Sequence, residues 1–219
     1  FPEPSHTSFT IGISDEVTLK AKINVAKDFS VLKIKAGTKD DKNLIDFIRK
    51  HTDKPLYIDV NQGWKNELEA MRFLEWLQNK NVLIVEQPLP KHLKKEMIWL
   101  TKRSPITLIA DESVKRLSDL EKMENAFHGI NIKLMKCTGL AEAQQMIRLG
   151  RSMNKKLLIG CMSESSCAVS AAAQLSALTD HADLDGPLLI NNDPFIGIRF
   201  EKGKIVLNDQ VGIGVRKRD

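Results

Sequence analysis

The sequence predicts an α/β fold, a (β/α)8 barrel of the TIM type, from a repeat that runs through most of the chain. Short apolar, β-branched runs recur about every 25 residues and are typical of buried parallel strands. Segments with helical spacing lie between them, so the pattern predicts βαβ units and a parallel sheet. Eight such units within 219 residues fit a compact closed barrel better than an open doubly wound sheet.

The elements follow one another in a regular order. The eight predicted strands are centred near Thr10, Lys33, Ile58, Leu83, Leu108, Ile132, Leu158 and Leu184. Good helix formers with helical spacing fill intervals between them, at residues 42–50, 67–78, 93–102, 141–153 and 166–178. Turn residues such as Gly37, Gly63 and Gly139 separate the units.

The pattern changes after Asp185. Residues 199–201 and 204–207 are two short segments on either side of Lys202-Gly203, and this pattern predicts a hairpin. We therefore expect a single barrel domain over residues 1–219, with a C-terminal hairpin and tail from about residue 188.

Composition and charge exclude several classes of protein. The formal net charge is +5, but the basic residues are scattered among acids and form no stripe with interleaved aromatics, so no nucleic-acid partner is expected. The apolar stretches are far too short to span a membrane. Cys137, Cys161 and Cys167 have neither a disulfide nor a zinc spacing, which favours a reducing, cytoplasmic location. A homo-oligomer is compatible with this sequence.

Three acidic residues, Asp59, Glu86 and Asp111, end three successive predicted strands. In a barrel of this kind, catalytic groups stand at the C-terminal ends of the strands. A carboxylate at the end of a buried strand is unfavourable unless a positive charge meets it, so three neighbouring ones predict a Mg²⁺ site. Each could instead cap the following helix, as Asp111-Glu112-Ser113 would. That alternative does not explain why five consecutive strands carry such residues at the same end.

Lysines flank this acidic set. Lys33 and Lys35 share one face of the second predicted strand, and Lys133 lies on the sixth. Because these two strands are opposed across an eight-stranded barrel, Lys35 and Lys133 would face a bound molecule from opposite sides. This arrangement suits removal of a proton from carbon on one side and its return on the other. Lys136 is a competitor for the role of Lys133, although it lies off the alternating face.

These motifs in this order closely resemble the enolase superfamily, in its muconate-lactonizing subgroup and, within that, the dipeptide epimerases. The matching segments are Lys33-Ile34-Lys35, Asp59-Val60-Asn61, Val85-Glu86-Gln87-Pro88, Ala110-Asp111-Glu112-Ser113 and Asn131-Ile132-Lys133. The resemblance implies the C-terminal barrel of that superfamily, a modified (β/α)7β barrel. It also implies Mg²⁺ bound by Asp59, Glu86 and Asp111, with Lys35 and Lys133 as the acid/base pair. Lysine bases with Mg²⁺ are the known pattern of the superfamily, so this assignment is not independent of it.

The same resemblance suggests how a substrate is held. Lys33 would support Lys35 and contact the substrate carboxylate. Asp183 and Asp185 resemble the DxD element that holds the α-ammonium group of a dipeptide, although Asp185-Gly186-Pro187 is also an ordinary turn sequence. Cys161 and Ser163 lie in a loop that resembles the one whose backbone contacts the substrate carboxylate, and Thr10 is a further candidate for substrate binding.

The function implied is Mg²⁺-dependent epimerisation of dipeptides, Ala-Glu-like ones among them, by 1,1-proton transfer through a metal-stabilised enolate. Two alternatives stay open: a muconate cycloisomerase or o-succinylbenzoate synthase-like enzyme, and a non-catalytic barrel that binds a ligand. Family members also carry an N-terminal capping domain of roughly a hundred residues. Because residues 1–4 lead almost directly into the first strand, we expect that this domain is missing from the chain and belongs to a longer protein.

Overall fold

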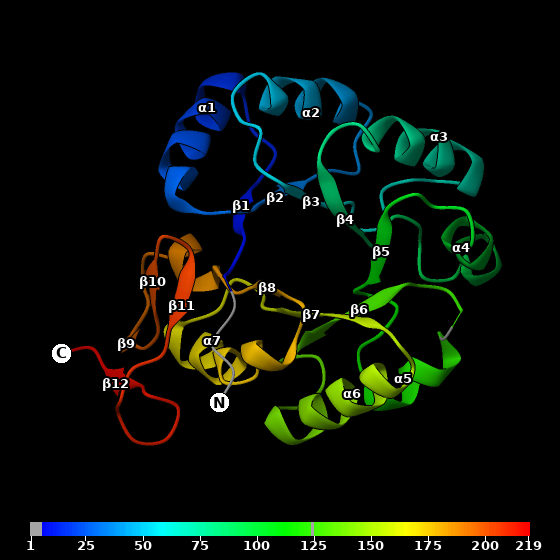
Figure 1. The fold of residues 1–219 in the computed structure, drawn as a ribbon. Helices are drawn as coiled ribbons and strands as arrows, with labels where there is room; N and C mark the ends of the chain where they lie inside the picture. Colours follow the sequence, from blue (N-terminus) through cyan, green and yellow to red (C-terminus); the bar gives the residue numbers. More distant parts are fainter. Residues whose placement is uncertain (1–5, 124) are drawn as a thin grey trace.

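The computed structural model describes residues 6–123 and 125–219, and residues 1–4, which bear on the expected capping domain, lie outside them. Eight parallel strands form one sheet in the order β1 to β8, and the helices surround this ring (Figure 1). The strands are β1 (Phe9–Ile11), β2 (Leu32–Lys35), β3 (Leu56–Asp59), β4 (Val82–Glu86), β5 (Thr107–Ala110), β6 (Gly129–Lys133), β7 (Lys156–Gly160) and β8 (His181–Asp183). The predicted α/β barrel is therefore confirmed.

Both ends of the sheet meet. Thr7, just before β1, forms a parallel bridge with Ala182 of β8, and the Ser8 N–H donates to the Ala182 carbonyl over 3.0 Å. These contacts join β1 to β8 and turn the sheet into a barrel. The Thr7 hydroxyl also accepts the Leu184 N–H at 2.7 Å. The Leu184 N–H therefore bonds to a side chain and not to the backbone of a neighbouring strand, so β8 ends at Asp183. The predicted centre of this strand, near Leu184, lies one residue beyond its end.

One α-helix follows each of the first seven strands. They are α1 (Glu16–Val25), α2 (Asp41–Arg49), α3 (Glu67–Leu77), α4 (Lys94–Thr101), α5 (Leu117–Lys122), α6 (Leu140–Ser152) and α7 (Ser166–Ala173). Short 3₁₀ helices follow α1, α7 and β8: η1 (Ala26–Asp28), η2 (Ser176–Leu178) and η3 (Gly186–Leu189). Since β8 leads into η3, the described part of the chain has the (β/α)7β topology. The predicted helix over 166–178 is divided into α7 and η2.

The inward faces of the strands change character along the barrel. Tyr57, Ile84, Ile109 and Leu158 form a separate buried apolar cluster, where the Tyr57 hydroxyl lies 2.9 Å from His181 Nδ1. Two residues further along three of these strands, on the same face, stand Asp59, Glu86 and Asp111. The apolar cluster therefore forms a floor, and the polar residues lie above it at the C-terminal ends of the strands.

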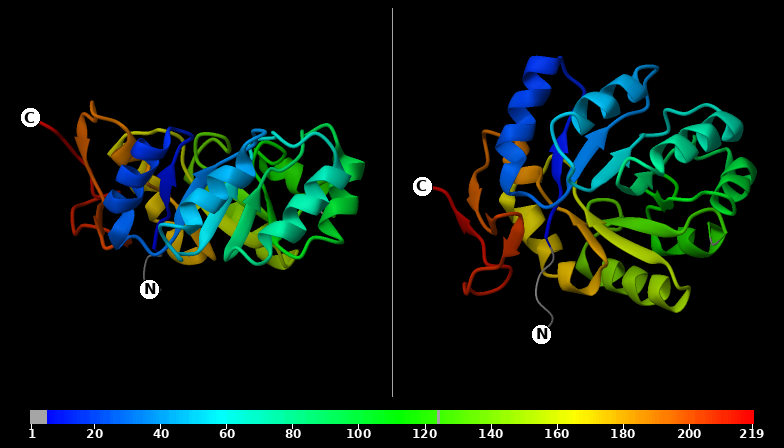
Figure 2. Two further views of the ribbon diagram at one scale, coloured as in Figure 1. Left: turned by 90° about the horizontal axis from the view of Figure 1, so that it is seen from above. Right: turned by 45° about the horizontal axis from the view of Figure 1, so that its top comes forward.

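The tail packs against the side of the barrel that carries α1 (Figure 2, left). It contains the predicted hairpin, β10 (Arg199–Glu201) and β11 (Lys204–Val206), and a second pair, β9 (Phe195–Ile196) with β12 (Arg216–Lys217). Asp193 accepts the Ser166 N–H at 2.7 Å and the Ser166 hydroxyl at 2.6 Å, while the Ile198 N–H donates to Ser170 Oγ at 2.9 Å. The tail thus caps the N-terminus of α7 and fixes the start of the helix that follows the β7 loop.

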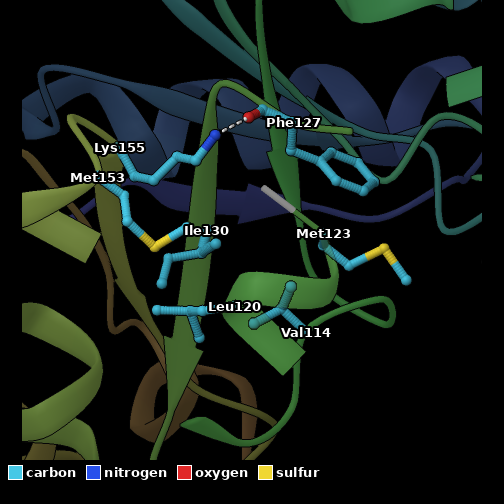
Figure 3. Close-up of a pocket in the computed structure, with 7 residues that line it drawn as sticks. All are labelled: Val114, Leu120, Met123, Phe127, Ile130, Met153 and Lys155. Atoms are coloured by element: carbon cyan, nitrogen blue, oxygen red, sulfur yellow. Dashed lines mark hydrogen bonds between the residues drawn. The ribbon is translucent and has the colours of Figure 1, made fainter. Parts of the chain in front are cut away.

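A small apolar cavity lies between α5, β6 and the end of α6, lined by Leu120, Ile130 and Met153 among others (Figure 3). At its edge, Lys155 Nζ donates to the Phe127 carbonyl at 2.8 Å. Its volume of about 10 Å³ is at the lower limit for a single water molecule. It is a packing gap, not a ligand site. No helix among residues 6–123 and 125–219 is both long and apolar enough to cross a bilayer.

Candidate active site

The C-terminal ends of the strands bring the predicted site residues to one cavity of about 330 Å³. Nine of those residues line it: Thr10, Lys33, Lys35, Asp111, Lys133, Cys161, Ser163, Asp183 and Asp185. The other two, Asp59 and Glu86, are almost fully buried and contact the lining residue Lys33. The site is therefore continuous from the buried carboxylates to the open end of the barrel.

Lys33 lies at the centre of three carboxylates from three different strands. Its Nζ is 3.0 Å from Asp59 Oδ2, 2.8 Å from Glu86 Oε2 and 2.7 Å from Asp183 Oδ2. The Lys33 side chain is 3% exposed. In this arrangement Lys33 is a counter-ion for the acids, and its contact with a substrate carboxylate stays a prediction.

The pKa values show how strongly these groups interact. Burial opposes ionisation of Lys33, yet the carboxylates of Asp183, Asp59 and Glu86 raise its pKa well above the ordinary value. Burial, together with the charge of Asp59, raises the pKa of Glu86 to about 7. Asp59 is buried too, but the Lys33 and Lys35 ammonium groups lower its pKa. The pKa of Glu86 is thus raised mainly by burial and further by the neighbouring carboxylates, although Lys33 and Lys133 act in the opposite direction.

The donor set fits a hard divalent cation in its chemistry. Asp59 and Glu86 are register partners on neighbouring strands, and Asp111 follows β5 directly. Three carboxylates are the oxygen ligands that Mg²⁺ prefers. Within residues 6–123 and 125–219, no three His, Cys, Asp or Glu side chains are arranged as a metal-binding group. Lysine ammonium groups lie on the carboxylates instead, so a cation would share or replace these contacts.

Asp111 has two lysine partners. Lys133 Nζ lies 3.0 Å from Asp111 Oδ2, and Lys136 Nζ pairs with Asp111 Oδ1. Both lysines line the cavity, but Lys133 is less exposed. Asp111 does not cap the next helix, because α5 begins at Leu117 and its first turn is capped by Asp119. The capping alternative for Asp111 is therefore wrong.

Lys35 lies at the opposite side of the acidic set, on β2. Its Nζ is 2.7 Å from Asp59 Oδ2 and 3.3 Å from Asn61 Oδ1, and its side chain is 35% exposed. Asn61 has a left-handed backbone with φ of 46° and donates to Glu112 Oε1 at 3.4 Å. Asn61 and Glu112 also line the cavity, although the sequence had assigned them no role. The sequence feature that could have predicted a role for them is their position close to Asp59 and Asp111.

Asp183 and Asp185 are held by residues from the other end of the chain. The Ser8 hydroxyl donates to Asp183 Oδ1 at 2.7 Å. Thr10 donates its N–H to Asp185 Oδ2 at 2.6 Å and its hydroxyl to Asp185 Oδ1 at 3.2 Å. Asp185 does begin a turn, because its carbonyl accepts the Leu188 N–H. Its carboxylate is nevertheless a lining group of the cavity, and Thr10 orients it.

The loop after β7 forms another wall. The Cys161 N–H donates to the Asp183 carbonyl at 3.1 Å, and the Met162 N–H donates to Glu164 Oε1 at 2.7 Å. These two amides are thus engaged within the protein. Burial raises the pKa of the Cys161 thiol, which keeps it protonated. Ser163 is exposed at the cavity wall, and Met162 Sδ lies 3.9 Å from Lys133 Nζ.

Asp185 makes the stability of the metal-free protein depend on pH. Burial and the neighbouring Asp183 raise the pKa of Asp185 from 3.8 to about 7. Between these values the folded state holds a proton that the unfolded chain has lost, so stability falls as pH rises. We expect Asp185→Asn to remove a decrease on the order of 2–4 kcal/mol across this window.

Urea unfolding in EDTA at several pH values would measure this decrease. Asp209→Asn, at an exposed tail position, is the matched control for loss of one charge. Parallel pH profiles for wild type and Asp185→Asn would contradict the assignment.

Comparison with known proteins adds to this geometry. A family model described as "Enolase C-terminal domain-like" matches residues 16–219. The chain is 48% identical over 212 residues to the L-Ala-D/L-Glu epimerase of Bacteroides thetaiotaomicron. This match covers 96% of the chain but 55% of the relative, so the chain spans about half the length of that protein.

Solved structures agree with this match. A substrate-liganded complex of the L-Ala-D/L-Glu epimerase from Bacillus subtilis has a TM-score of 0.91 at 27% identity, covering 98% of this chain and 64% of that one. The dipeptide epimerase from Enterococcus faecalis V583, complexed with Mg and L-Leu-L-Tyr, has a TM-score of 0.90 at 28% identity, with the same coverage.

Proposed function

The chain belongs to the enolase C-terminal domain-like family, and on that premise we propose that the protein containing it is a Mg²⁺-dependent dipeptide epimerase. The main support is the composition of one cavity. It is lined by lysines from β2 and β6 and by two carboxylates at the end of β8. This combination suits a substrate that carries both an acidic C–H bond and an ammonium group.

The two lysines would exchange a proton with the α-carbon of the C-terminal residue. Lys35 would act from the β2 side and Lys133 from the β6 side, one as base and the other as acid. Such help is worth about 10²–10⁴-fold, or about 3–6 kcal/mol. Enzymes generally supply about 8 kcal/mol or more, so electrostatic stabilisation must provide the rest.

Asp59, Glu86 and Asp111 would hold Mg²⁺. When bound, this ion supplies positive charge beside the substrate carboxylate and so makes the α-proton more acidic. The clustering of these acids supports this assignment, because Asp59 and Glu86 are register partners on neighbouring strands and Asp111 directly follows the next strand. The magnesium named in the Enterococcus faecalis complex supports it as well.

Asp183 and Asp185 would bind the α-ammonium group of the dipeptide. Two carboxylates gain much from a cationic amine and nothing from an anionic substrate. They therefore favour an epimerase over a cycloisomerase or an o-succinylbenzoate synthase-like enzyme. The Bacteroides thetaiotaomicron relative, an L-Ala-D/L-Glu epimerase, makes L-Ala-L-Glu the first substrate to test.

Proton exchange in D₂O tests the proposal. The protein is incubated with Mg²⁺ and L-Ala-L-Glu, and NMR follows the α-proton of the glutamate. We expect deuterium there and the appearance of the L,D-dipeptide. N-acetyl-L-Ala-L-Glu, which lacks the ammonium group, is the matched control and should react far more slowly. Turnover of a succinylbenzoate precursor without dipeptide exchange would support the alternative enzyme, and no reaction with either would support a binding protein.

A further inference from the structure

Gln87 follows Glu86 directly at the end of β4 and is fully buried, with 0% exposure. Its backbone is left-handed, with φ of 39°. Glycine is the residue that adopts this conformation without steric cost. A buried glutamine at such a position has a strained backbone, and the surrounding structure must offset this strain. We therefore expect the Gln87 side chain to make contacts that offset the strain of its backbone.

Those contacts fill every hydrogen-bonding position of the Gln87 amide group. Its Oε1 accepts the backbone N–H groups of Asp111 and Ser113, both at 3.1 Å. Its Nε2 donates to Ser113 Oγ at 2.9 Å and to the Leu89 carbonyl at 3.0 Å. Gln87, which follows Glu86 in the sequence, thus holds the backbone of Asp111 through its side chain.

The backbone of Gln87 links the same loops. Its N–H donates to the Ile109 carbonyl of β5 at 2.9 Å, and its carbonyl accepts the Gln62 N–H at 2.8 Å. Gln62 belongs to the loop after β3, three residues beyond Asp59. Gln87 is therefore bonded to the segments that carry all three carboxylates.

We propose that Gln87 is a positioning residue that fixes Asp111 relative to Glu86 and so sets the affinity of the acidic set for a divalent cation. This rests on the proposed function in one respect: Asp59, Glu86 and Asp111 hold Mg²⁺. Gln87 itself contacts no cation and acts through the main chain of Asp111. Residues that orient metal ligands in this way typically contribute 10–100-fold to metal affinity.

Calorimetric titration with Mg²⁺, without substrate, tests the role of Gln87. Gln87→Met keeps the volume of the side chain but removes its hydrogen bonds, and we expect Mg²⁺ to bind about 10–100-fold more weakly. Ser113→Ala is the matched control, because it removes one bond of Gln87 and leaves the Asp111 N–H bonded. Its affinity should equal that of wild type. Thermal unfolding in EDTA reports whether each variant folds.

Two further variants separate positioning from general packing. In Gln87→Glu, burial favours the protonated acid, which keeps an oxygen for the Asp111 and Ser113 N–H groups and an O–H that can donate to the Leu89 carbonyl. This variant should therefore bind Mg²⁺ at least as well as wild type. Gln87→Gly suits the left-handed backbone and should reproduce the weak binding if the methionine variant does not fold.

The possible failures are distinguishable. Equal Mg²⁺ affinity in wild type and in the folded methionine or glycine variant would overturn the positioning role alone. Loss in Gln87→Glu as large as in Gln87→Met would also overturn it, since the accepting oxygen would then be irrelevant. A wild type that binds no Mg²⁺ would overturn the metal assignment and this inference with it.

Discussion

Epimerisation by Lys133→Ala should be at least about 10²–10⁴-fold slower than by wild type, because one of the two proposed proton-transfer groups is lost. Exchange of the α-proton of one stereoisomer should persist, since Lys35 can still remove a proton from the side of the substrate that faces β2. NMR in D₂O would measure exchange and epimerisation in the same sample. The variant should fold, because Asp111 keeps Lys136 as a partner.

Lys136→Ala is the matched control for Lys133→Ala, since both lysines contact Asp111 and line the cavity. It should epimerise dipeptides much faster than Lys133→Ala. The reverse result, with activity lost in Lys136→Ala and kept in Lys133→Ala, would transfer the acid/base role to Lys136.

Replacement of Lys33 by methionine should strongly destabilise the metal-free protein. Its ammonium group is bonded to Asp59, Glu86 and Asp183, all buried, and removing one partner of such a cluster costs about 3–5 kcal/mol. The loss should be larger at pH 8 than at pH 6, because Glu86, with its pKa of about 7, is then more fully ionised. Urea unfolding in EDTA at both pH values would measure it.

Lys35→Met is the control for Lys33→Met. The Lys35 side chain is 35% exposed, and its partner Asp59 keeps Lys33, so a clearly smaller loss is expected. Added Mg²⁺ should restore part of the stability of Lys33→Met by neutralising the acids. Equal losses in the two variants would mean that Lys33 is not the main counter-ion, whereas no effect of Mg²⁺ would contradict the proposed cation site at these acids.

Periodicity was enough to predict the barrel, because each βαβ unit repeats the same apolar pattern. Bounds of the longer helices differ from the predicted ones by about one residue. No bounds were predicted for α1 or α5, and α5, with six residues, is too short for its helical spacing to be recognised. The end of β8 depends on the Thr7 hydroxyl, a contact between residues far apart in the sequence.

The candidate site was predictable where it depends on strand alternation. Four residues lie at the C-terminal ends of the strands, as predicted: Lys35, Asp59, Glu86 and Asp111. What alternation could not predict is which groups bond to one another. The burial of Lys33 among acids from three strands, and the contact of Thr10 with Asp185, depend on barrel closure. The role of Gln87 depends on a left-handed backbone that favours glycine.

Because the barrel closes between β1 and β8, the site has two parts that respond differently to damage at the first strand. The acids proposed to hold Mg²⁺ end consecutive middle strands, whereas Asp183 and Asp185 depend on Ser8 and Thr10, 175 positions away in the sequence. Proteolytic trimming of the first strand, or a fusion that strains it, would therefore first disturb Asp183 and Asp185, the residues proposed to bind the amino group. Under the proposed roles, such damaged molecules would still bind the cation but would bind the dipeptide more weakly.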